Sequence, residues 1–170
     1  MRYFNGFCFK DEHRLFLEYL DSSEYCVSGF SYGAIKAVKF LSDYSKRVDK
    51  LQLFSPAFFQ NRSKKYKSLQ IELFKKDRIS YIKNFIKNSL YPSSIEVGEF
   101  IGDCSVDELE ELLNFTYDEK IIEDFIKRGI EIEIYLGDMD KIVDSESVFE
   151  FFKPFATIYR FKNRGHILHG

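Results

Sequence analysis

The sequence is poor in the residues that mark several classes of protein. It has no Trp, two Met, three Pro and three Cys in 170 residues, and its formal net charge is only −2. A net charge near zero disfavours a nucleic-acid-binding module that depends on bulk positive charge. A hydrophobic content of 45%, with 11 Tyr and 19 Phe, disfavours a disordered or collagen-like chain. We therefore expect one globular domain over residues 1–170 and no nucleic-acid partner.

Membrane and metal signals are also scarce. No apolar run approaches the roughly 18 residues that a membrane-spanning helix needs, and the first residues lack the basic and apolar regions of a secretory signal. We expect a cytoplasmic monomer that does not contact a membrane. Cys8, Cys26 and Cys104 are too scattered for a disulfide framework, and no pair has zinc-site spacing. We expect buried free thiols, no metal site and no cofactor.

Short apolar runs rich in β-forming residues alternate with stretches of helical periodicity, a pattern typical of an α/β fold with a mostly parallel sheet flanked by helices. The predicted strands are Tyr3–Phe7, Tyr25–Phe30, Lys50–Phe54, Ile130–Leu136 and Thr157–Phe161. The segment Asp11–Leu20 predicts a crossover helix, because Leu15, Phe16, Tyr19 and Leu20 share a helical face. A second helix is predicted after Ser31.

The interval from about 58 to 125 contains no convincing strand and several amphipathic helical stretches. One is Arg78–Leu90, with Ile79, Ile82, Phe85 and Ile86 on one face. Ser105 and Glu108 form a capping-box pattern. We expect a helical lid inserted into the sheet domain. Its apolar faces either line a substrate tunnel or belong to the ordinary core.

The charges of this insertion are strongly segregated. Residues 61–90 contain nine basic side chains against two acidic ones, a net charge of +7. Residues 91–130 contain three basic side chains against eleven acidic ones, a net charge of −8. The near-zero total therefore hides two oppositely charged halves.

The segment Gly29-Phe30-Ser31-Tyr32-Gly33 matches the G-x-S-x-G nucleophile elbow between a predicted strand and a predicted helix. The glycines Gly29 and Gly33 suit a turn in which strand and helix approach too closely for a Cβ, and the turn exposes the serine hydroxyl. The alternative is an ordinary strand-to-helix turn with a capping serine.

A serine nucleophile needs a base and an orienting carboxylate. His166 follows the last predicted strand, so in a parallel sheet it lies at the same edge as Ser31. Asp140 lies in the turn after the strand Ile130–Leu136 and is favoured over Asp138 as the more exposed toward that edge. The chain order Ser31, Asp140, His166 is typical of α/β-hydrolases. The other histidines, His13 and His169, are expected at the surface and in a frayed terminus.

An oxyanion hole usually combines the amide after the nucleophile with an amide from the loop after an earlier strand. Tyr32 supplies the first. Asn5-Gly6-Phe7 stands where a His-Gly-x segment is common, so the Phe7 amide is the candidate for the second. A plain Asn-Gly turn is the competing interpretation.

These motifs resemble the α/β-hydrolase superfamily, and nearly the whole chain resembles the pimelyl-acyl-carrier-protein methyl ester esterases of the BioV type. The segments that carry the resemblance are Asn5–Phe7, Val27–Ala37, Leu53–Pro56, the Gly137–Asp140 turn and His166. Because 170 residues are few for this fold, the resemblance implies a trimmed α/β-hydrolase with a lid. It also implies hydrolysis of the methyl ester that caps a pimelyl chain on acyl-carrier protein, in biotin biosynthesis.

Under this resemblance, His166 takes the proton of Ser31, Asp140 orients His166, and the Phe7 and Tyr32 amides hold the oxyanion. The acidic carrier protein would dock on the basic stretch, whose candidate residues are Arg62, Lys64, Lys65, Lys75, Lys76 and Arg78. The stretch is equally compatible with a solvated face balanced by the acidic segment. The alternatives to the function are an esterase or thioesterase acting on free small acyl esters and a non-catalytic hydrolase-like binding protein.

Overall fold

A computed structural model describes residues 1–170 and contains one five-stranded sheet, which confirms the predicted α/β fold. Neighbouring strands are parallel and follow the chain order β1-β2-β3-β4-β5. The strands are β1 (Arg2–Phe4), β2 (Cys26–Phe30), β3 (Lys50–Phe54), β4 (Glu131–Gly137) and β5 (Thr157–Phe161). Their carboxyl ends therefore meet at one edge of the sheet, where parallel α/β folds place their binding sites.

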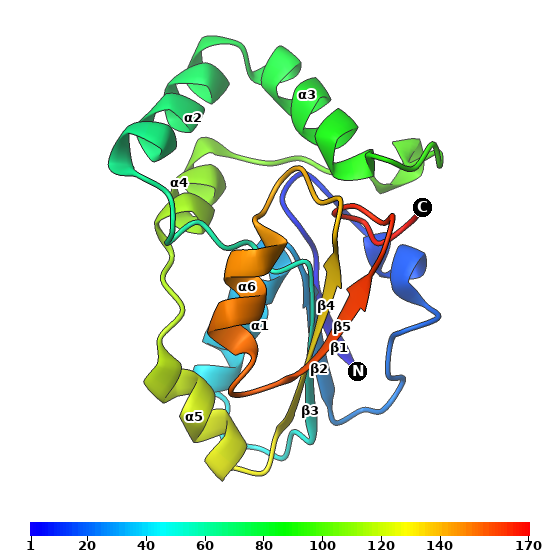
Figure 1. Cartoon of the computed structure of the whole chain (residues 1–170), viewed down its shortest axis with the longest axis vertical. Helices are drawn as coiled ribbons and strands as arrows, with labels where there is room; N and C mark the ends of the chain where they lie inside the picture. The colour runs from blue at the N-terminus through cyan, green and yellow to red at the C-terminus, as the bar shows by residue number, and fades with distance from the viewer.

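Three helices cover one face of the sheet: α1 (Tyr32–Asp43), α5 (Glu119–Lys127) and α6 (Ser145–Phe152) (Figure 1). Local signals set their ends. Asp118 and Asp144 cap α5 and α6 through their side chains, and Gly129 ends the α5 region in the left-handed conformation at φ 80°. The fully buried Val38, Ile122 and Phe152 are among the core residues that these helices contribute.

The opposite face is covered by the segment that joins β1 to β2, and here the helix prediction was wrong. Only a short 3-10 helix, η1 (Glu12–Phe16), forms in the predicted Asp11–Leu20 helix. The Gln52 side chain binds the backbone farther along, accepting from the Asp21 amide at 2.9 Å and donating to the Tyr19 carbonyl at 3.0 Å. These bonds hold the end of the segment, while at its start Asp11 has a positive φ of 52°, which is not helical. Inside the segment the Tyr19 and Leu20 N–H groups both donate to the Phe16 carbonyl oxygen, and the Phe16 ring stacks on Phe54 at 4.8 Å.

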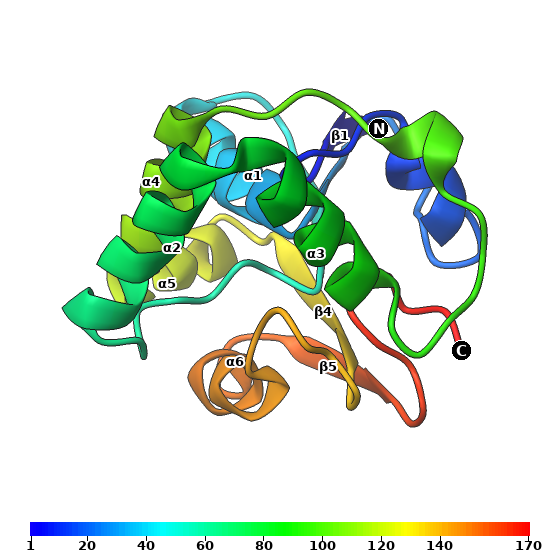
Figure 2. The same cartoon turned by 90° about the horizontal axis from the view of Figure 1, so that it is seen from above.

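Helices α2 (Lys64–Lys76), α3 (Arg78–Leu90) and α4 (Val106–Asn114) lie over the carboxyl edge of the sheet, as Figures 1 and 2 show. We call these three helices the roof. A one-turn 3-10 helix, η2 (Gly98–Phe100), joins α3 to α4, and the Ser105–Glu108 capping box begins α4 as predicted. The predicted apolar face of α3 was wrong at Ile79, which lies in the first turn of the helix and is 81% exposed, whereas Ile86 is buried.

The prediction of three free thiols was wrong for two of the cysteines. Cys8 and Cys104 form a disulfide across a sequence separation of 96 residues, and only Cys26 is free and buried. Spacing could not predict this pair, because folding alone brings the loop after β1 against the segment before α4. A backbone hydrogen bond from Gly102 to Cys8 and a bridge between Phe9 and Ile101 join the same segments.

No helix combines the length and apolar character needed to cross a membrane.

Candidate active site

The elbow after β2 places Ser31 at the carboxyl edge of the sheet in a strained conformation. Its φ of 52° and ψ of −114° are rare for a residue other than glycine. A Cβ on Gly29 would lie 2.2 Å from the Gly33 carbonyl oxygen, and one on Gly33 would lie 1.9 Å from the Phe4 carbonyl oxygen. Both positions therefore require glycine, for the reason that the motif predicts.

The side chains of Ser31, His166 and Asp140 form a continuous hydrogen-bonded chain. His166 Nε2 lies 2.9 Å from Ser31 Oγ, and His166 Nδ1 lies 2.7 Å from Asp140 Oδ2. The His166 side chain is fully buried and the Asp140 side chain is 1% exposed. When Nδ1 donates to Asp140, Nε2 is the atom that can accept the serine proton. The arrangement can therefore activate Ser31 as a nucleophile.

Asp140, and not Asp138, faces the histidine. The second carboxylate oxygen of Asp140 accepts the Ile142 and Val143 amides at 2.7 and 3.0 Å, which fixes the carboxylate in its own turn. Asp138 instead forms an ion pair with Arg160 at 3.1 Å.

The Phe7 and Tyr32 amides are both free to bind an oxyanion, since neither donates to an acceptor within the protein. Tyr32 is the first residue of α1, so its N–H is one of the unpaired donors of a helix N-terminus. Phe7 lines the same pocket as Ser31. The Tyr32 side chain points elsewhere: its hydroxyl donates to Glu111 of α4, and burial raises its pKa.

The other two histidines lie outside this hydrogen-bonded chain. His13 is half-buried with its ring 5.5 Å from the Tyr3 ring. The expectation of a frayed His169 was wrong, because its Nε2 lies 2.8 Å from the Leu15 carbonyl oxygen. That bond ties the last residues of the chain to the segment between β1 and β2.

Two buried polar residues next to the site, Ser55 and Glu12, were not predicted from the sequence. Ser55, at the end of β3, donates its hydroxyl to the His166 carbonyl oxygen at 2.7 Å and so holds the histidine loop. Its place at the carboxyl end of a strand was the available signal. Glu12 accepts the Gly6 amide at 2.7 Å. Helical periodicity puts Glu12 on the face of Phe16 and Tyr19, which could have identified it as buried.

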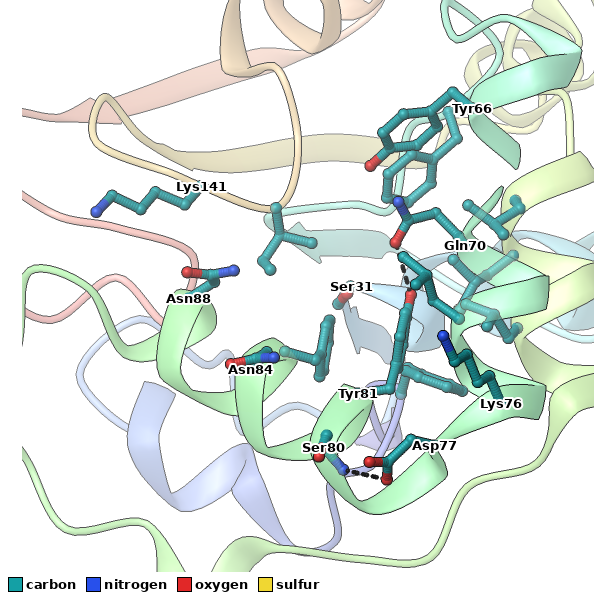
Figure 3. Close-up of a pocket in the computed structure, with 18 residues that line it drawn as sticks. Ser31, Tyr66, Gln70, Lys76, Asp77, Ser80, Tyr81, Asn84, Asn88 and Lys141 are labelled. Carbon is teal, nitrogen blue, oxygen red and sulfur yellow. Dashed lines mark hydrogen bonds between the residues drawn. The ribbon is translucent and has the colours of Figure 1, made fainter. Parts of the chain in front are cut away.

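A pocket of about 500 Å³ opens over Ser31 beneath the roof. Figure 3 shows Ser31 near its centre, with Lys141, Asn84 and Asn88 to one side and Lys76 to the other. Leu73 of α2, Phe85 of α3 and the α4 leucines give the pocket an apolar wall; those leucines are Leu109, Leu112 and Leu113. The space suits an acyl chain more than a highly charged ligand. No cluster of three or more His, Cys, Asp or Glu residues could hold a metal ion.

The predicted docking residues are all exposed, but they differ in their partners. Lys75 pairs with Glu110 at 3.0 Å, and Arg78 pairs with Asp103 and donates to the Cys104 carbonyl at 2.7 Å. The remaining four form no ion pair within the protein: Arg62, Lys64, Lys65 and Lys76. Part of the acidic segment is also accounted for, because Glu108 and Glu111 of α4 pair with Lys36 and Lys39 of α1.

Comparison with solved structures identifies the fold. A hydrolase from Oleispira antarctica has a TM-score of 0.68 and 14% identity, over 99% of this chain and 84% of that one. MenH from S. aureus has a TM-score of 0.62 and 12% identity, over 96% and 85%. The fold is that of a trimmed α/β-hydrolase.

The naproxen esterase (carboxylesterase NP) of Bacillus subtilis has a TM-score of 0.58 and 16% identity, over 84% of this chain. The chain spans 53% of the length of that esterase and 59% of an esterase from Exiguobacterium antarcticum. No protein-family model and no curated protein sequence matches the chain.

Proposed function

We propose that this protein is a serine carboxylesterase that hydrolyses the methyl ester of methyl pimelyl-acyl-carrier protein to pimelyl-acyl-carrier protein and methanol. The observation that carries the esterase activity is the buried chain of hydrogen bonds from Ser31 through His166 to Asp140, beneath a largely apolar pocket. The methyl ester, the carrier protein and the role in biotin biosynthesis rest on the sequence resemblance.

The chemistry has two halves. Ser31 Oγ attacks the ester carbonyl carbon while its proton passes to His166 Nε2, and the Phe7 and Tyr32 amides hold the resulting oxyanion. The tetrahedral intermediate collapses, the carbon–oxygen bond to the methoxy group breaks, and His166 protonates the leaving group to give methanol. A water that gives its proton to His166 then attacks the acyl-enzyme and frees the carboxylic acid and Ser31.

The pocket and the roof fit an acyl chain presented by a larger carrier. The apolar wall formed by Leu73 and the α4 leucines would take the methylene groups of the chain. The exposed cations of α2 that lack an internal partner would meet the acidic carrier and steer its approach. Lys64 and Lys65 are the best candidates because both are exposed and unpaired at the start of α2.

The decisive experiment compares methyl pimelyl-acyl-carrier protein with free monomethyl pimelate, detecting the acid by mass spectrometry. We expect kcat/KM to be at least about 100-fold higher for the carrier substrate, and Ser31→Ala to abolish turnover while keeping the circular dichroism spectrum. Equal specificity constants would favour an esterase or thioesterase of free small esters. Turnover of neither substrate by the native chain would favour a non-catalytic binding protein.

Docking is tested by charge reversal on the roof. The pair Lys64→Glu and Lys65→Glu should raise KM for the carrier substrate about 10-fold at low salt, leave kcat unchanged, and lose most of the effect at high ionic strength. The matched control is Lys46→Glu with Lys120→Glu, two exposed and unpaired lysines away from the roof. A KM that shifts equally in both pairs would reject docking at α2.

A further inference from the structure

Glu12 is a carboxyl group buried without a counter-charge close to the proposed oxyanion hole. The residue is fully buried and takes part in no ion pair. Its Oε1 accepts the Gly6 N–H at 2.7 Å and the Tyr3 hydroxyl at 3.2 Å, while the buried Oε2 has no hydrogen-bond partner. Tyr3 of β1 and the neighbouring Asp11 are the titratable groups that act on it. Such a group is costly to bury, so a specific role is needed to explain it.

The contact with Gly6 lies one residue before the proposed oxyanion donor. The Gly6 carbonyl oxygen accepts the Phe9 N–H at 3.2 Å. In a trans peptide the C=O and N–H bonds point in opposite directions, so this bond turns the Phe7 N–H away from Phe9. The Phe7 N–H is left without a protein acceptor, in a residue that lines the pocket beside Ser31.

Gly6 needs an external restraint because glycine populates more backbone conformations than any other residue. The Glu12 carboxyl group is one such restraint, because it accepts the Gly6 N–H. The Phe9 N–H is the other, because it donates to the Gly6 carbonyl oxygen. The two bonds together fix both ends of Gly6 and therefore the plane of the Gly6–Phe7 peptide.

We propose that Glu12 is a positioning residue for the esterase reaction: by binding the Gly6 N–H, it keeps the Phe7 N–H aimed at the oxyanion. The assignment rests on the proposed serine esterase function. This role accounts for a carboxyl group that is buried like a core residue in the segment between β1 and β2. Burial raises the pKa of Glu12 to about 7, in agreement with an enclosed group that has no cationic partner.

The test measures turnover of a p-nitrophenyl acyl ester and binding of an alkyl boronic acid, which adds to the serine hydroxyl and places an oxygen where the oxyanion forms. In Glu12→Ala we expect kcat to fall about 10- to 100-fold with KM changed less than about 3-fold. Affinity for the boronic acid should fall by the same factor. Glu12→Gln keeps an oxygen acceptor for the Gly6 N–H and should recover kcat to within about 5-fold of the native value.

Two controls separate positioning from loss of stability. Tyr3→Phe removes the other hydrogen bond to Oε1 and keeps the ring, so kcat should stay within about 2-fold of the native value. Ile122→Ala truncates a fully buried residue of the remote helix α5 and should lower Tm without lowering kcat.

Native kcat and native boronic acid affinity in a folded Glu12→Ala variant would overturn the assignment while leaving the esterase function intact. A native chain that neither hydrolyses the ester nor binds the boronic acid at Ser31 overturns the esterase function and this assignment with it.

Discussion

The carboxylates of Asp138 and Asp140 lie two positions apart in one loop, yet only one contacts the histidine. Asp140→Asn should lower kcat for an acyl ester by about 10,000-fold, because the amide favours the wrong histidine tautomer and does not stabilise the imidazolium. Asp138→Asn breaks only a half-exposed ion pair with Arg160, so its kcat should stay within about 3-fold of the native value. Steady-state kinetics of the two variants checks this, and equal losses would contradict the assignment of Asp140.

Glu12 makes the stability of the fold depend on pH. The carboxyl group holds its proton up to a pH of about 7 in the folded state but releases it near its ordinary value of 4.5 in the unfolded chain. Between these values the folded state binds more protons, so the free energy of unfolding falls as pH rises, by up to about 3 kcal/mol. Burial is the cause.

Urea unfolding at several pH values between 4.5 and 7.5 measures this slope. Glu12→Gln should remove the Glu12 contribution, so the difference in unfolding free energy between native chain and variant should change by about 3 kcal/mol across that range. A difference that stays constant with pH would show that Glu12 titrates normally.

At the scale of elements, the contact between β1, β2 and α1 depends on a glycine. A Cβ on Gly33 would lie 1.9 Å from the Phe4 carbonyl oxygen, so Gly33→Ala must push α1 away from β1. We expect a loss of about 3 kcal/mol or more in unfolding free energy and a large loss of kcat. Gly98→Ala is the matched control because no atom lies within 4 Å of its Cβ position. Thermal unfolding and kinetics compare the two variants, and equal Tm values would reject the close packing.

Most elements were predictable where local signals agreed. Strands β3 and β5 and helix α3 have their predicted limits, and the capping box of Ser105 and Glu108 begins α4 as predicted. The helix predicted over Asp11–Leu20 was wrong, because the periodicity of its apolar residues shows only that one side of the segment is buried and not that the backbone is helical. Gln52 binds the backbone at the end of this segment, at Tyr19 and Asp21, and the local sequence does not encode a tertiary partner of this kind.

At the scale of the whole molecule, the Cys8–Cys104 disulfide ties the loop after β1 to the start of α4. Oxidised protein, unfolded in denaturant, should contain one reactive thiol, Cys26, and reduced protein should contain three. The double variant Cys8→Ser and Cys104→Ser should lose about 2–4 kcal/mol of unfolding free energy, because a loop across 96 residues is no longer closed in the unfolded chain.

Cys26→Ala is the matched control, since it removes a buried thiol that belongs to no disulfide. Its unfolding free energy should fall by about 1 kcal/mol, and its oxidised form should contain no reactive thiol. Three reactive thiols in the unreduced native protein would contradict the disulfide.

The parallel sheet, the elbow and the order Ser31, Asp140, His166 were determined by the sequence alone. Each depends on a short pattern: apolar runs of strand length, glycines that allow a close approach, and polar residues after strands whose carboxyl ends share an edge. Each of these patterns spans only a few neighbouring residues, so the structure that it favours does not depend on contacts with distant parts of the chain.

Tertiary structure decided what depends on segments far apart in the chain. Only the folded chain shows that Cys8 meets Cys104, that Ser55 holds the His166 loop and that Glu12 reaches the Gly6 amide. The folded chain also pairs Lys75 with Glu110 of α4 and Arg78 with Asp103, just before α4. The other predicted docking residues form no ion pair. These contacts arise from packing, which joins residues through space, and no spacing along the sequence encodes them.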